Sequence, residues 1–123
     1  MADNVKSKAL KMIIAIVQRG KADTVVGAAI KAGAPAATVV FGRGQGMRER
    51  LGPLGVAIQP EKEIILVILE EWLSEQVLRA MVSAGNLDKA GVGFVFEVAV
   101  EKALGFVEAH EMLATEKKPA CWR

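Results

Sequence analysis

Two short segments of the chain are apolar at every position, and they restrict the fold more than any other feature. These segments are MIIAIV at 12–17 and IILVIL at 64–69. Both are rich in β-branched residues, which favours strands. A strand that buries only one face alternates apolar with polar residues, and neither of these segments alternates. The sequence therefore predicts a sheet that is covered on both of its faces.

The remaining elements fall into the order β-α-β-β-α-β. The first helix is expected from Asp23 to Gly33, because glycine suits a left-handed helix end and Pro35 prevents continuation. The second is expected to begin at Ser74, acting as N-cap, and to end at Gly85. The strands are predicted at 12–18, 38–41, 63–69 and 94–100. This order predicts the α+β class, as a ferredoxin-like sandwich with an antiparallel sheet.

Two helices can cover only one face of a four-stranded sheet, so the second apolar face needs another partner. Burying the outward face of one strand, roughly four Ile, Leu or Val side chains, is worth about 6–10 kcal/mol before entropy costs. That gain is comparable to the whole stability of a domain. We therefore expect neighbouring subunits to pack their sheets together in a closed homo-oligomer, and the monomer to be poorly stable alone.

Length, charge and cysteine count exclude several classes of protein. At 123 residues the chain forms one domain, and its formal net charge of +2 is too weak to indicate general nucleic-acid binding. No apolar run approaches the length of a membrane span, and MIIAIV is too short for a signal-peptide core. The single cysteine, Cys121, excludes an internal disulfide framework. We expect a cytoplasmic protein with no nucleic-acid partner and no direct membrane insertion.

A glycine-rich segment separates the second and third predicted strands. A hairpin needs about two to five residues to turn, whereas this connection uses seventeen, at 42–58. Its start, GRGQG at 42–46, follows a strand as a dinucleotide-binding fingerprint does. That fingerprint needs a helix at the glycines, and Gly52, Pro53 and Gly55 oppose one. The chain also has no GK[ST] sequence, so the Walker phosphate loop is excluded.

A second glycine-rich segment, GNLDKAGVG at 85–93, connects the second helix to the fourth strand. Glycines let backbone N–H groups approach an anion closely, and successive N–H groups in a turn form a phosphate-binding nest. If the two segments meet across a subunit boundary, they form an anion site with Arg43, Arg48 or Lys89 nearby. The alternative is that each segment is simply a permissive turn, and spacing alone leaves both interpretations open.

Other kinds of chemistry find little support. His110 is the only histidine and Cys121 the only cysteine, which leaves few ways to build a metal site or a nucleophile–histidine pair. Glu61 and Glu63 flank Lys62 at a strand entrance, where alternation places both carboxylates on one face. A solvated strand end explains that pair without catalysis. We expect neither an enzyme nor a bound metal.

Four stretches of this chain, taken in order, resemble the PII signal-transduction superfamily, and in particular its PII-like relatives with a shortened loop. The stretches are IIAIVQRGKADTVVGAAIKAGAPAATVV, FGRGQG, IQPEKEIILVIL and LDKAGVGFVFEVAV. The resemblance implies a PII-like domain at 12–105, assembled as a trimer with its sheets facing inward. A polar lead-in at 1–11 precedes this domain, and a C-terminal extension at 106–123 follows it.

The resemblance also implies a function, namely binding of an adenine nucleotide in the clefts between subunits. The T-loop would be 42–58 and the B-loop 85–93, with Thr38 matching the threonine that contacts adenine. The bound effector would set the conformation of the T-loop, which then docks on a protein target, a membrane transporter being one candidate. The effector-binding residues implied are Thr38, Arg43, Gly44, Gln45, Gly46, Met47, Lys89, Ala90, Gly91, Val92 and Gly93. Partner binding is expected from Arg48, Arg50, Leu51 and Leu54.

Several departures from the family pattern narrow this expectation. The chain has no tyrosine and its loop has no serine, so neither tyrosine uridylylation nor serine phosphorylation of the loop can occur. Met47 stands where the family has an arginine, so Arg43 or Arg48 would have to substitute. After the fourth strand, VEKALG offers only Lys102. Each lost charge-assisted phosphate contact costs about 1.5–3 kcal/mol.

We therefore expect AMP or ADP in preference to ATP, or a small anion such as bicarbonate. The resemblance does not imply sensing of nitrogen or 2-oxoglutarate. The alternative is a structural trimer of the same fold, related in shape to divalent-cation-tolerance proteins, which binds protein partners without a small-molecule effector.

Overall fold

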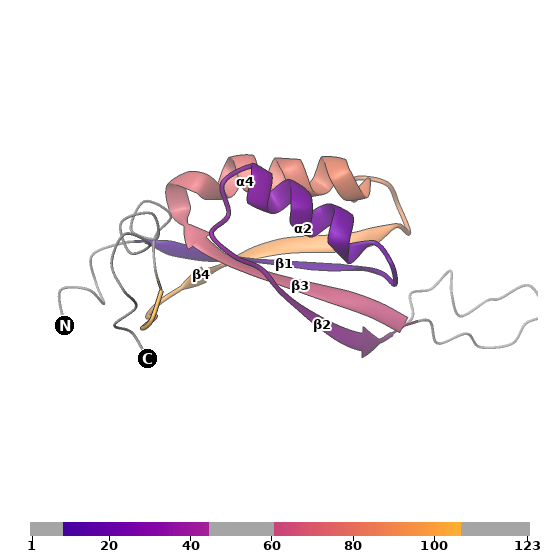
Figure 1. The fold of residues 1–123 in the computed structure, drawn as a ribbon, viewed down its shortest axis with the longest axis horizontal. Coiled ribbons are helices and arrows are strands. Elements are labelled where there is room, and N and C mark those ends of the chain that lie inside the picture. The colour runs from indigo at the N-terminus through magenta and orange to yellow at the C-terminus, as the bar shows by residue number, and fades with distance from the viewer. Residues whose placement is uncertain (1–8, 45–60, 107–123) are drawn as a thin grey trace, which may run out of the picture.

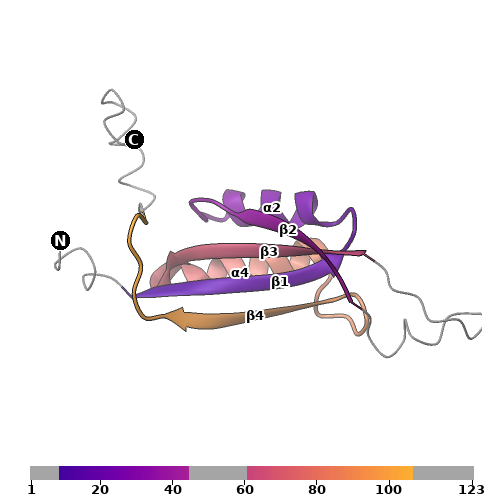
Figure 2. The same ribbon diagram turned by 90° about the horizontal axis from the view of Figure 1, so that it is seen from below.

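The computed structural model describes residues 9–44 and 61–106, and within them the predicted order of elements is confirmed (Figure 1). The elements are β1 (Leu10–Gln18), α2 (Ala22–Lys31), β2 (Thr38–Arg43), β3 (Glu61–Glu70), α4 (Glu71–Gly85) and β4 (Gly93–Val100). They form two layers, with both helices on one face of a single sheet (Figures 1 and 2). This is the predicted ferredoxin-like arrangement.

The sheet has the strand order β2-β3-β1-β4, and each pair of neighbouring strands is antiparallel. The central β1 pairs with β3 on one side and with β4 on the other, so that Ile14 lies opposite both Leu66 and Phe96. The outer strands β2 and β4 are therefore the two edges of the sheet (Figure 2).

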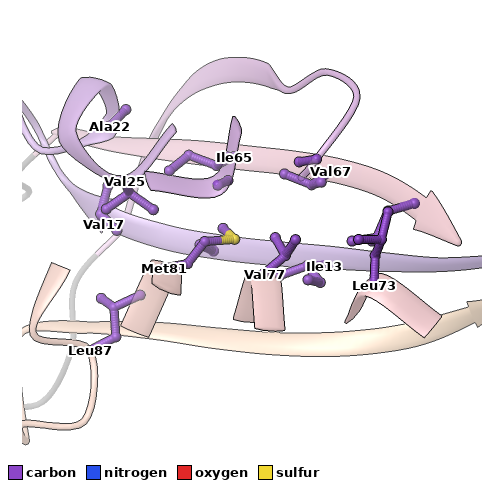
Figure 3. Close-up of a cluster of buried hydrophobic side chains, with 14 residues drawn as sticks. Ile13, Val17, Ala22, Val25, Ile65, Val67, Leu73, Val77, Met81 and Leu87 are labelled. Atoms are coloured by element: carbon purple, nitrogen blue, oxygen red, sulfur yellow. The ribbon is translucent and has the colours of Figure 1, made fainter. Parts of the chain in front are cut away.

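The core lies between the sheet and the two helices (Figure 3). Alternate residues of β1 and β3 point toward the helices and are buried. From the helices, Val25 of α2 and Val77 and Met81 of α4 meet them, all without solvent exposure. The buried strand residues are Ile13, Ala15, Val17, Ile65, Val67 and Leu69. Burying this many branched side chains is the main favourable contribution to the fold.

The opposite face of the sheet is also apolar, as the two non-alternating segments predicted. In the isolated chain Phe94 is 60% exposed, Phe96 38% and Val98 39%, and the rings of Phe94 and Phe96 lie 5.4 Å apart between centroids. No helix among the described residues covers this face (Figure 1). We call it the open face. Its apolar residues are Met12, Ile14, Ile16, Val40, Ile64, Leu66, Ile68, Phe94, Phe96 and Val98.

The start of α4 differs from the sequence prediction. Ser74 was expected as N-cap, which is wrong, because α4 begins at Glu71 with Glu70 in the N-cap position. Ser74 lies inside the helix, where its Oγ donates to the carbonyl oxygen of Glu71 at 2.9 Å. The physical reason is that β3 continues to Glu70 and passes directly into the helix, with no connecting loop in which a serine could cap. β1 likewise begins at Leu10, two residues earlier than predicted.

The two helix ends follow the predicted glycines in different ways. Gly33, just beyond α2, has a φ of +122°, which agrees with the predicted left-handed end. α4 ends at Gly85 as predicted, but the left-handed residue is Asn86, with a φ of 54°. Gly85 is closely packed, since a Cβ there would lie 3.0 Å from a methyl of Val25 and 3.1 Å from the Leu87 side chain.

Gly93 is closely packed against the end of β1, and it provides a test of the fold. A Cβ at this position would lie 2.9 Å from the backbone oxygen of Ile16 and 2.7 Å from Leu87. We expect Gly93→Ala to lower the free energy of unfolding by about 1–3 kcal/mol, because the backbone of β1 must shift. The measurement is urea unfolding followed by circular dichroism.

Gly27→Ala is the matched control, since Gly27 lies inside α2 with nothing within 4 Å of a Cβ. This control is expected to raise the free energy of unfolding by about 0.5–1 kcal/mol. Equal effects of the two substitutions would contradict the packing assigned to Gly93.

Candidate ligand site at the loop end of the sheet

Both predicted glycine-rich loops join the sheet at the same end. Here β1 and β2 end while β3 and β4 begin, so that Arg43 lies opposite Glu61 and Val17 lies opposite Gly93 (Figure 1). We call this end the loop end. The arrangement follows from antiparallel pairing alone, because the partner of a strand that ends here must begin here.

Only part of the predicted T-loop lies within the described residues. Arg43 is the last residue of β2, and Gly44 follows it with a partly buried backbone. Seven predicted site residues lie outside the described residues: Gln45, Gly46, Met47, Arg48, Arg50, Leu51 and Leu54. Their assigned roles stay predictions.

The predicted B-loop is a compact turn between α4 and β4. Leu87 is only 8% exposed and joins the core, which anchors the turn (Figure 3). Within the turn the Lys89 N–H donates to the carbonyl of Asn86 at 3.1 Å, and the Val92 N–H donates to that of Lys89 at 3.3 Å. Gly91 has a φ of +82°. The exposed residues that this anchored turn presents are Asn86, Asp88, Lys89, Ala90 and Gly91.

The two loops lie on opposite edges of the sheet. β2 and β4 are separated by β3 and β1, and strands in a sheet are about 4.8 Å apart, so the edges are about 14 Å apart. Arg43 and Lys89 therefore do not face a common ligand within one chain. Thr38 is also separate, since it starts β2 on the open face opposite Leu66, about 17 Å along the strand from Arg43. Among the described residues of one chain, the T-loop base and the B-loop are therefore not adjacent.

Two carboxylates of β3 bind the turn between β1 and α2. One oxygen of Glu63, Oε1, accepts hydrogen bonds from the backbone N–H of Gly20 at 3.1 Å and of Ala22 at 2.8 Å. Glu61 forms an ion pair with Arg19, whose Nη1 donates to Oε1 at 2.5 Å. Alternation had placed both carboxylates on one face, which agrees with these contacts.

Sequence reasoning had assigned these carboxylates to a solvated strand end and missed the β1–α2 turn as their partner. The signal that could have found it is topological. Since the end of β1 lies beside the start of β3, residues after Gln18 must lie near Glu61 and Glu63.

Residues 9–44 and 61–106 contain no group of three or more His, Cys, Asp or Glu side chains that could hold a metal ion. None of the helices found in these ranges has the length and apolar character required to cross a bilayer.

A comparison with protein-family models decides the family. The model for "Nitrogen regulatory protein P-II" matches residues 10–106, which is most of the chain. The chain belongs to the P-II family. A comparison with curated protein sequences found no match. P-II proteins are regulatory signalling proteins and not enzymes, as the sequence predicted here. Members of the family commonly bind adenine nucleotides, and they are typically trimers that bind protein targets.

Glu63 allows a test of how the loop end is held in place. Its carboxylate lies at the positive end of the α2 dipole and accepts hydrogen bonds from two backbone N–H groups. We expect Glu63→Gln to lower the free energy of unfolding by about 1–2 kcal/mol, because losing the charge removes the charge–dipole energy and weakens the two hydrogen bonds, which the amide oxygen can still accept. Thermal and urea unfolding measure this.

The control for that experiment is Glu75→Gln. Glu75 pairs with Arg79 on the exposed surface of α4, where an ion pair contributes little. A loss of stability as large in the control as in Glu63→Gln would show that the contacts to Gly20 and Ala22 are unimportant.

Proposed function

We propose that this P-II family protein is a cytoplasmic sensor that works as a homotrimer. An adenine nucleotide, AMP or ADP in preference to ATP, binds between the T-loop base of one subunit and the B-loop of its neighbour. The signalling domain is taken as 12–105, with 106–123 as an extension. The observation that carries this proposal is that the two glycine-rich segments share one end of the sheet but lie on opposite edges.

A closed ring of subunits would join these edges. In a head-to-tail ring the surface of one subunit meets a different surface of the next, so the β4 edge can meet the β2 edge of its neighbour. The apolar open face supports such an assembly, because burying it removes Phe94, Phe96 and Val98 from water. The family's usual trimeric state gives the number of subunits.

The residues on the two edges suit a phosphate-bearing ligand. Arg43 and Lys89 supply positive charge, and Gly44 and Gly91 allow a close approach of backbone N–H groups to an anion. Thr38 lies about 17 Å along β2 from Arg43, so in this proposal its hydroxyl, which can donate and accept, meets the adenine at the far end of an extended nucleotide. Two cationic side chains are few for binding a triphosphate, so this set of residues favours AMP or ADP over ATP. Bicarbonate, as a small anion, is a further effector candidate.

The output of the proposed sensor is the loop 42–58. An effector can drive this loop only if it binds one loop conformation better than another. The partner is a protein, and a membrane transporter is the candidate class. The contacts are expected from Arg48 and Arg50 by charge, and from Leu51 and Leu54 by apolar burial.

A second function has support from one specific observation. Gly91 and Gly93 each have a structural reason in the described chain: the first has a positive φ, and the second packs against the Ile16 backbone. Both glycines are thus explained without a ligand, which favours a structural trimer that binds only protein. In that case Lys89→Ala would leave partner binding unchanged.

Calorimetric titration of the full chain tests the sensor. We expect binding of AMP and ADP, with ATP weaker, and about ten- to hundredfold loss of affinity in Lys89→Ala, because a charge-assisted phosphate contact is removed. Bicarbonate is titrated in parallel. No heat with any of these compounds at millimolar concentration would rule out the sensor and favour the structural trimer.

Light scattering tests the assembly. We expect the wild-type chain to have the mass of a trimer, and Phe96→Asp to shift it to a monomer that unfolds more easily, since a carboxylate cannot be buried unpaired in the open face. Ile30→Asp is the control, because Ile30 is 44% exposed on α2, away from the open face. A monomeric wild-type chain, or equal dissociation in both variants, would contradict the ring.

A further inference from the structure

Three charged residues lie side by side across the loop end. Arg43 of β2 is the register partner of Glu61 at the start of β3, and directly opposite residues in an antiparallel pair share a face. On the other side of β3, Arg19 follows the end of β1 and binds the Glu61 carboxylate. The order across the strands is therefore cation, carboxylate, cation.

The carboxylate is held by only one of its two cationic neighbours. The ion pair of Glu61 with Arg19 has side chains 55% and 72% exposed, respectively, so it is accessible to solvent and to ligands. Within residues 9–44 and 61–106, Arg43 forms no ion pair. Arg19 thus holds Glu61 on the β1 side, and the charge of Arg43 is left for another anion.

We propose that Glu61 determines specificity by ligand charge, and that Arg19 is a positioning residue that prevents Glu61 from neutralising Arg43. This inference rests on the proposed function, in which the phosphate groups lie at Arg43 and Gly44. A fixed negative charge beside Arg43 repels each further phosphate of a longer nucleotide. It therefore favours a monophosphate over a triphosphate.

The expected size of this effect follows from Coulomb's law. Free of magnesium, ATP carries about two more negative charges than AMP, and each interacts with Glu61 over several ångströms at a solvent-exposed site. We expect removal of the Glu61 charge to raise the ATP-to-AMP affinity ratio about three- to tenfold. The effect should shrink in concentrated salt, because the screening length falls to about 3 Å at 1 M.

The experiment is calorimetric titration of the full chain with magnesium-free AMP and ATP, at low and at high salt. In Glu61→Gln we expect the ATP-to-AMP affinity ratio to rise at low salt and to approach the wild-type value at high salt. In Arg19→Gln we expect both nucleotides to bind about three- to tenfold more weakly, because Glu61 is then free to pair with Arg43. The double variant Arg19→Gln/Glu61→Gln should recover AMP binding, which shows that the two residues act through one another.

Glu75→Gln and Arg79→Gln are matched controls. Glu75 and Arg79 form an exposed carboxylate–arginine pair on α4, with side chains 73% and 78% exposed. These controls should leave both affinities unchanged. Circular dichroism melts of all variants confirm that each one is folded.

The possible failures are distinguishable. If the wild-type chain binds AMP and Glu61→Gln leaves the ATP-to-AMP ratio unchanged at low salt, the role of Glu61 is wrong while the proposed function stands. If the controls shift the ratio as much as Glu61→Gln does, the effect is one of net charge and the assignment is also wrong. If the wild-type chain binds no adenine nucleotide, both the proposed function and this inference are wrong.

Discussion

The structure depends on a four-stranded sheet that is apolar on both faces but has helices on only one. Ile13, Ala15 and Val17 bury their side chains under the helices, while Met12, Ile14 and Ile16 point the other way from the same strand. A face of this kind in water is unfavourable in proportion to its area. The proposed association with further subunits would bury this face. It would also bring together the T-loop base and the B-loop, which start from opposite edges of the sheet in one chain.

The fold could be predicted well from the sequence because its signals are local. Continuous apolar runs predicted the central strands. Apolar residues at helical spacing, followed by a glycine, predicted the helices. The failure at Ser74 has a clear cause. Serine is a good N-cap in isolation, but β3 extends to Glu70 and passes straight into α4, so the helix starts three residues earlier. The point at which a strand ends depends on its pairing with neighbouring strands. The capping preference of a single residue carries no information about that pairing.

The candidate site was less predictable, because it depends on which strands are neighbours. The glycine-rich segments left an anion site and a permissive turn both open, and the role of Gly44 came from the family resemblance. The family match agrees with a regulatory protein. The contacts of Glu61 and Glu63 with the β1–α2 turn join segments more than forty residues apart in sequence. Only the pairing of β1 with β3 brings them together. The same carboxylates look like an ordinary polar strand end when read along the chain.

The placement of the two glycine-rich loops on opposite edges has a consequence for how a ring of such subunits responds to its effector. In the proposed ring, each subunit would contribute its β2 edge to one binding site and its β4 edge to the next. Only two strands, β3 and β1, separate these edges, so a strain imposed on one edge by a ligand would have a short path to the other. In the proposed ring, occupied and vacant sites would then be energetically linked, and successive effector molecules would bind with unequal affinity. Such a ring would grade its response by the number of sites filled, rather than switching in a single step.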